Sequence, residues 1–177
     1  MPRTNVRAAR YAEAAFGVAR RQDELDAWLD ALDRAAALFV GGPAGPFLTS
    51  PVVAPHRKIA ALAELLPGLP PMVANFVEIL AQRDRLDLVP EIAANFRRLL
   101  HEHQGIAVVQ VTTAIPLDER QRELLGGRLA ARVGKRVELE TRVDPAILGG
   151  VVAQIGDDVI DGSVRGRLER LRRSMMA

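Results

Sequence analysis

The spacing of apolar residues changes once along this chain, near Gly105, and this change limits the possible folds more than any other feature. Before Gly105 apolar residues recur every three or four positions, which is the period of a helix with one buried face. After Gly105, IAVVQVTTA is rich in β-branched residues, and KRVELETRVD alternates apolar with polar residues as a half-buried strand does. The sequence therefore predicts a helical part followed by a part that contains a sheet.

The helical part, residues 1–105, is predicted to be a six-helix bundle. Trp28, Leu32 and Phe39 lie on one face of the second helix, and the turns GGPAGPFLTSP and LPGLPP interrupt the helical period because proline and glycine favour turns. The helices are expected from residue 5, over 23–40, briefly around Phe47, along PHRKIAALAELL, over 71–84 and over 86–104.

The second part, residues 106–177, is predicted to be a small α+β domain, so the chain as a whole is mainly α. Its expected order is a strand, the helix LDERQRELLGGRLAARVG, a second strand, another strand or pair in GGVVAQIGDDVI, and a helix from Ser163. The domain boundary is placed near 105, where Gly105 suits the end of a helix.

The run GGVVAQIGDDVIDGSVRG combines glycines with aspartates, which raises the question of a calcium loop. In the EF-hand spacing Asp157 and Asp161 fit the first and fifth positions, but Val159 and Leu168 fall where oxygen ligands are required. The run is better explained as strands and turns: Gly149–Gly150 allow a bulge or a close backbone approach, and Ser163 suits the N-cap of the last helix.

No catalytic, cofactor or metal site is predicted. The chain has no cysteine, and Gly134-Lys135 lacks both the glycine and the hydroxyl residue that a P-loop requires. His101 and His103 are two positions apart on a helix, so they point about 200° apart and cannot share a metal on one face. Every apolar stretch is also interrupted before the roughly 20 residues that a membrane span needs, so no direct membrane insertion is expected.

Arginines at 165, 167, 170, 172 and 173 raise a nucleic-acid alternative. They alternate around an apolar stripe, as in an amphipathic helix. Aromatic residues make up only 4% of the chain and the net charge is +2, so the chain has few side chains for stacking on bases and little excess positive charge for binding phosphates. We expect no nucleic acid partner, although a generic helical adaptor or an RNA-binding protein with an arginine-rich C-terminal helix remains the alternative.

The segment VDPAILGGVVAQIGDDVIDGSVRGRLERL, residues 143–171, resembles the C-terminal motif of the delta subunit of F-type ATP synthase, the bacterial counterpart of the oligomycin-sensitivity-conferring protein. ARYAEAAF resembles the opening helix of that family, Trp28 falls in its second helix, and FLTSPVVAPHRKIAAL resembles its third and fourth. The resemblance covers essentially the whole chain. It implies a non-catalytic stator subunit, peripheral on the cytoplasmic face of the bacterial cell membrane through the complex.

The resemblance also implies where partners bind. The family contacts the alpha subunits of the catalytic head through its first and fifth helices, which here suggests Tyr11, Ala14, Ala15, Asn75 and Ile79. The alternative is that the alanines belong to the core of the bundle.

The C-terminal domain of the family binds the b-type subunits of the peripheral stalk. The apolar stripe of Val164, Leu168 and Leu171 is the expected contact. The alternative is that this stripe closes the small domain itself.

Overall fold

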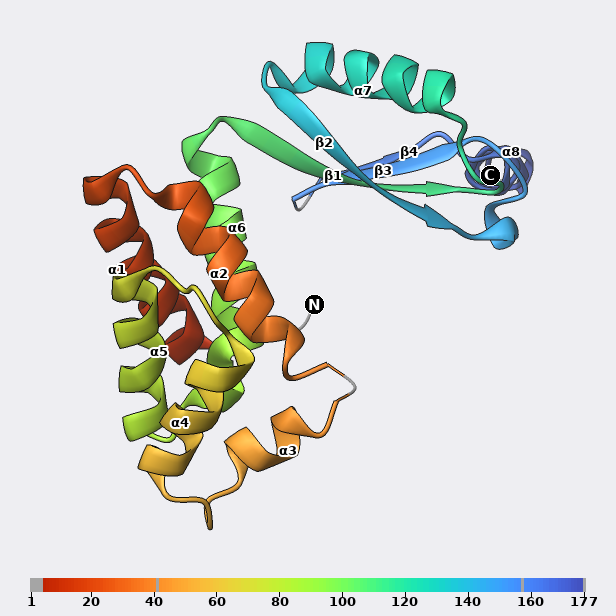
Figure 1. Cartoon of the computed structure of the whole chain (residues 1–177). Coiled ribbons are helices and arrows are strands. Elements are labelled where there is room, and N and C mark those ends of the chain that lie inside the picture. Colours follow the sequence, from red (N-terminus) through yellow and green to blue (C-terminus); the bar gives the residue numbers. More distant parts are fainter. Residues whose placement is uncertain (1–4, 41, 157, 177) are drawn as a thin grey trace. The chain divides into compact units, whose positions relative to one another are not determined.

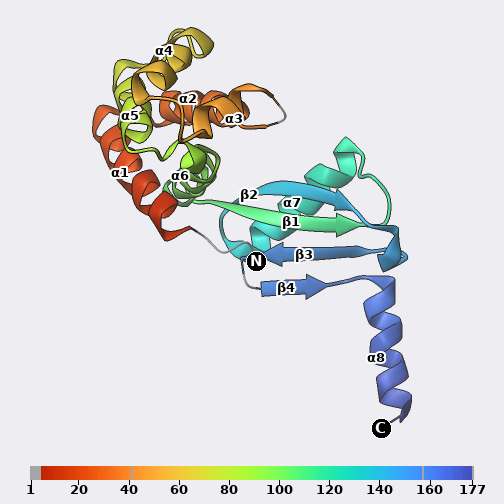
Figure 2. The same ribbon diagram turned by 90° about the horizontal axis from the view of Figure 1, so that it is seen from below.

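The structure is a computed structural model that describes residues 5–40, 42–156 and 158–176 (Figures 1 and 2). It divides into two compact units, Met1–Leu100 and His101–Ala177. The chain is mainly helical, and a four-stranded sheet lies in its C-terminal part, which confirms the predicted combination of a helical part and a smaller α+β part.

The helices of the first unit follow the predicted order with shorter bounds. They are α1 (Val6–Gln22), α2 (Leu25–Ala37), α3 (Ala44–Thr49), α4 (Pro55–Leu65), α5 (Pro71–Gln82), the 3-10 turn η1 (Leu86–Leu88) and α6 (Val89–His103). The helix predicted over 86–104 thus begins as a 3-10 turn. Pro90 stands in the first turn of α6, where its missing N–H leaves no helical hydrogen bond unmade.

The core of the first unit combines small residues on α1 with large rings on its neighbours. The inward positions of α1 are all alanines, Ala8, Ala12, Ala15 and Ala19, and all are buried. Alanines allow other helices to approach α1 closely. Aromatic rings from the neighbouring helices fill the interior beside them: Trp28 stacks on Phe96 with ring centroids 6.3 Å apart and ring planes 8° apart. The core of the first unit therefore joins the alanine face of α1 to rings from α2 and α6.

The second unit contains a sheet with strand order β2-β1-β3-β4. Its elements are β1 (Ile106–Thr113), α7 (Glu119–Val133), β2 (Arg136–Val143), the 3-10 turn η2 (Pro145–Ile147), β3 (Val151–Ile155), β4 (Asp158–Asp161) and α8 (Val164–Met176). β1 and β2 are parallel because α7 carries the chain back between them, whereas β3 is antiparallel to both β1 and β4.

α7 covers one face of this sheet (Figures 1 and 2). Its Leu129 packs with Val109 and Val111 of β1 and Ala153 of β3, and these form the buried cluster of the unit. The capping box of Asp118 and Gln121 fixes the start of α7. The residues of β1 that alternate with the buried valines face away from this cluster.

The glycine and aspartate run forms the joint that connects the sheet to α8. Gly150 has φ +80°, and a Cβ there would come within 2.5 Å of the Gly162 carbonyl oxygen, so only glycine fits. Of the two roles that the sequence allows for Gly149–Gly150, Gly150 therefore has the close backbone approach. Asp157, considered as a calcium ligand, lies outside the described residues.

Asp161 and Ser163 fasten the start of α8. The Asp161 carboxylate accepts hydrogen bonds from the Ser163 hydroxyl at 2.6 Å and the Ser163 backbone N–H at 2.8 Å. The Ser163 hydroxyl oxygen in turn accepts from the backbone N–H of Gly166 at 2.9 Å, as an N-cap does. The Ser163 hydroxyl and then the Ser163 backbone N–H lower the pKa of Asp161; desolvation opposes them less strongly, and nearby Arg170 lowers the pKa least.

Candidate partner-binding surfaces

The described residues contain no group of three histidine, aspartate or glutamate side chains placed to hold a metal ion. Within the same residues, no helix combines the length and apolar character that crossing a bilayer requires. The candidate sites described next are two surfaces, one on each unit.

The first surface lies on α1 and α5, where four of the five predicted residues are accessible. Ala14 and Asn75 are exposed, Ile79 is 47% exposed, and Tyr11 is half-buried. The Tyr11 ring meets Phe76 of α5 edge-on, with centroids 6.4 Å apart, so the two helices present these side chains together. We call Tyr11, Ala14, Asn75 and Ile79 the α1–α5 surface.

Ala15 is a correction to the predicted contact set. It is 2% exposed and belongs to the buried cluster of the first unit, together with Ala12 and Ala19 on the same stripe of α1. A position one residue after Ala14 is turned by about 100° on a helix, which is enough to move it from the surface to the core.

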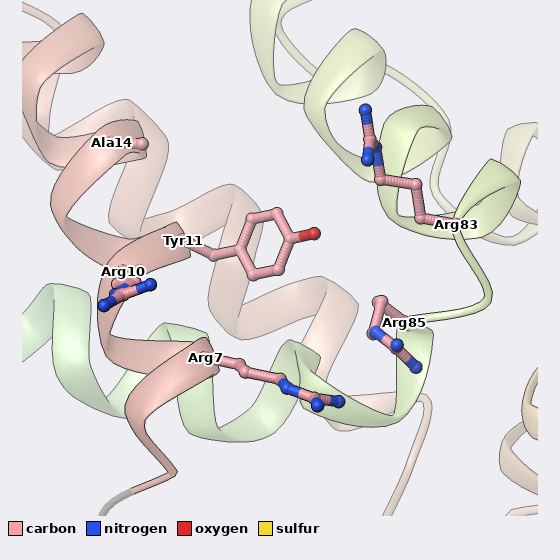
Figure 3. Close-up of a pocket in the computed structure, with 6 residues that line it drawn as sticks. All are labelled: Arg7, Arg10, Tyr11, Ala14, Arg83 and Arg85. Carbon is pink, nitrogen blue, oxygen red and sulfur yellow. The ribbon is translucent and has the colours of Figure 1, made fainter.

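A pocket of about 590 Å³ adjoins this surface (Figure 3). Arg7, Arg10, Tyr11 and Ala14 of α1 line it together with Arg83 and Arg85, which follow α5. Figure 3 shows the Tyr11 ring reaching from α1 toward the end of α5, and Arg7 extending toward Arg85. We call this the arginine pocket.

Sequence reasoning missed the four arginines. Arg7 and Arg10 are three positions apart and share a helix face, and this spacing beside Tyr11 was the available signal. Arg83 and Arg85 are distant in sequence, and only the packing of α5 against α1 brings them to the same pocket.

The second surface is the apolar stripe of α8. Val164 is 42% exposed, Leu168 is 53% exposed and Leu171 is 58% exposed. Val164 touches the joint, since a Cβ on Gly149 would lie 3.3 Å from its side chain, but the stripe as a whole is not buried in the second unit. The arginines beside it are partly engaged: Arg165 pairs with Glu169 at 3.1 Å, and Arg170 lies 4.0 Å from Asp161.

A family model described as "ATP synthase delta (OSCP) subunit" matches residues 8–175. The chain belongs to the ATP synthase delta (OSCP) subunit family. The matched residues cover most of both units and include both surfaces described above.

Individual relatives agree with this assignment. Proteins named ATP synthase subunit delta from Dehalococcoides mccartyi, Rubrobacter xylanophilus and Chromohalobacter salexigens are 34%, 36% and 37% identical to the chain. The matches cover 93%, 94% and 100% of this chain and 91%, 94% and 100% of the relatives.

A chain in the cryo-EM structure of the Toxoplasma gondii mitochondrial ATP synthase hexamer has a similar fold. Its TM-score is 0.71 at 24% identity, over 96% of this chain and 97% of that one. The likeness of fold therefore extends over nearly the whole of both chains.

Proposed function

We propose that the chain is a non-catalytic stator subunit of a proton-translocating F-type ATP synthase, joining the catalytic head to the peripheral stalk. The observation that carries the proposal is the family match over residues 8–175, which spans two units that each expose apolar side chains. A stator must resist rotor torque, and it does so through slow dissociation from its partners rather than through acid–base chemistry.

On this proposal α1–α6 form one bundle that folds by itself and binds the alpha subunits of the head through the α1–α5 surface. A helix from the head would pack its apolar face on Tyr11 and Ile79, and the small side chain of Ala14 lets it approach closely. Tyr11 is the anchor because its ring is already fixed against Phe76.

The test is Ala14→Asp in the full-length chain, with binding to the purified head measured by surface plasmon resonance. The aspartate should weaken binding because it places a solvated charge against an apolar partner face. Ala94→Asp is the matched control, since Ala94 is exposed on α6 and outside the α1–α5 surface. Equal affinity of the two variants would contradict this part of the proposal, provided that both keep wild-type thermal unfolding.

The second unit would bind the b-type subunits of the peripheral stalk through Val164, Leu168 and Leu171, with the arginines of α8 steering the approach. Exposed ion pairs usually contribute under about 1 kcal/mol each, so apolar packing is expected to dominate. The complex would hold the chain at the cytoplasmic face of the bacterial cell membrane without any insertion of the chain itself.

Leu171→Ala tests the stalk contact in a reconstituted, proton-driven ATP synthesis assay. Leu124→Ala is its control, because Leu124 on α7 is also 58% exposed. Leu171→Ala should reduce stalk affinity and coupled synthesis, and Leu124→Ala should not. If Leu171→Ala keeps stalk affinity and coupled synthesis while the double variant Arg172→Gln/Arg173→Gln loses them, charge rather than apolar packing holds the chain to the stalk.

A further inference from the structure

The arginine pocket carries an uncompensated positive charge. Among the residues that the structure describes, none of the guanidinium groups of Arg7, Arg10, Arg83 and Arg85 forms an ion pair. Within the described part of the chain, the one polar contact of these side chains is a long hydrogen bond from Arg85 to the Asp84 carbonyl oxygen, at 3.4 Å.

The acid nearest in sequence is directed elsewhere. Asp84 stands between Arg83 and Arg85, but its backbone has φ +52° and its carboxylate accepts a hydrogen bond from the buried Lys58 ammonium at 2.6 Å. The loop after α5 therefore pairs its carboxylate, whose side chain is 59% exposed, with Lys58, and it leaves two arginines, without an ion pair among the described residues, to line the pocket.

Arginines gathered in this way favour an anionic occupant. Like charges repel one another, and a carboxylate placed among them relieves the repulsion and can accept paired hydrogen bonds from a guanidinium fork. Tyr11 adds a phenolic O–H that can donate to the same carboxylate.

The neighbours of the pocket select a protein as the source of the carboxylate. The arginines lie where α1 begins and α5 ends, and Ala14, Ile79 and Asn75 continue from there along the α1–α5 surface. A nucleic acid would favour a basic stripe along its phosphates. An apolar surface with positive charge at one end instead suits a helix with an apolar face and carboxylates at one end.

We propose that the arginine pocket binds carboxylate side chains at one end of the head helix that packs on the α1–α5 surface, and so fixes the direction in which that helix lies. This inference rests on the head contact proposed above. The acidic end of the helix lies at Arg83 and Arg85, and its apolar length runs toward Ala14 and Asn75.

The first test is the affinity of the full-length chain for the purified head at low and high NaCl concentration. Arg83→Gln/Arg85→Gln should raise Kd about tenfold at low salt, equivalent to about 1.4 kcal/mol, and by less at high salt, because salt screens exposed charges. The control is Arg20→Gln/Arg21→Gln, which removes equal charge from the other end of α1 and should leave Kd nearly unchanged.

The outcomes separate this inference from the head contact itself. If Ala14→Asp weakens binding but the two arginine double variants behave alike, the pocket has no special role and the inference is wrong. If neither Ala14→Asp nor either double variant changes Kd, the α1–α5 contact is wrong as well. Binding of a single-stranded oligoribonucleotide that Arg83→Gln/Arg85→Gln abolishes, with head binding unchanged, would assign the pocket to nucleic acid.

A chemical test then locates the carboxylate. Lys58 and Lys135 are the only lysines of the chain, so Arg83→Lys adds one well-defined amine to the pocket. A carbodiimide activates a carboxylate, and attack by the lysine amine forms an amide as the corresponding urea leaves. Mass spectrometry should find residue 83 linked to an acidic residue at one end of a head helix, with Arg20→Lys giving no such link. Links from residue 83 to acids scattered over the head, or none, would overturn the proposal.

Discussion

The two units of the chain bury apolar side chains to very different extents. The first encloses Trp28, Phe96 and many aliphatic residues in one cluster, whereas the described buried cluster of the second consists of Val109, Val111, Leu129 and Ala153. A small core leaves little apolar burial to offset the entropy of folding. The second unit nevertheless keeps the stripe of α8 in solvent. The comparison indicates that the first unit has the larger apolar core, and on our proposal a partner covers the exposed stripe of α8.

The largest effect on stability should follow from a cavity in the core of the first unit, which reduces the difference between the two units. Phe96→Ala removes a ring that is fully buried and stacked on Trp28, which should lower the free energy of unfolding by about 3–5 kcal/mol. Trp28 is the single tryptophan, so its fluorescence in urea titrations reports on this unit alone. Phe47→Ala is the control, because Phe47 is 40% exposed. Equal losses for both variants would show that the first unit lacks the dominant core described here.

The joint before α8 should be the most sensitive point of the second unit. Gly150→Ala forces a side chain into a positive φ and against the Gly162 carbonyl, and the strained backbone alone costs about 1–3 kcal/mol. Far-UV circular dichroism during thermal unfolding measures the loss. Gly127→Ala on α7 meets nothing within 4 Å and should instead stabilise the unit, by up to about 1 kcal/mol. If both substitutions lower the thermal stability, or both raise it, the close approach at Gly150 does not constrain the joint as described here.

A smaller effect should appear as a pH dependence of the second unit. The pKa of Asp161 is lowered in the folded state, so the unfolded state binds more protons at acidic pH and stability rises with pH through this range. The contribution is present above the ordinary aspartate pKa of about 3.9 and is lost as the pH falls through the lowered value. Asp161→Asn should remove this contribution, as measured by thermal unfolding at a series of acidic pH values. An unchanged pH profile in the variant would count against the Ser163 hydrogen bonds.

The smallest effect should come from the stripe itself. Leu168→Ala replaces a side chain that is 53% exposed, so the isolated chain should change its stability by within about 0.5 kcal/mol. Thermal unfolding of the variant measures this directly. A loss as large as that of a core leucine would mean that the stripe closes the second unit, and the contrast between the units would then fail.

The sequence predicts elements better than it predicts surfaces. The change of period at Gly105 and the proline and glycine turns suffice to predict the order of helices and strands, because these signals are local. The 3-10 start at Leu86 and the parallel pairing of β1 with β2 depend on contacts across the chain.

Partner surfaces are harder because they depend on which side of a helix is covered. Ala14 and Ala15 are adjacent and chemically identical, yet one is exposed and the other is in the core. The arginine pocket combines the first turns of α1 with the loop after α5, which are far apart in the chain, so it leaves no continuous pattern in the sequence. Exposure of the α8 stripe likewise depends on how little of it the small sheet covers.

Hydrogen exchange, followed by mass spectrometry, of the chain alone and within the assembled ATP synthase tests the central claim most directly. Partners that bind the two surfaces should slow exchange in α8 and, to a smaller extent, in α1 and α5, since the latter are already protected by the first core. Strand β1, which lies between β2 and β3 in the sheet, should change least. Unchanged exchange in α8 upon assembly, with slowing confined to other elements, would contradict the account.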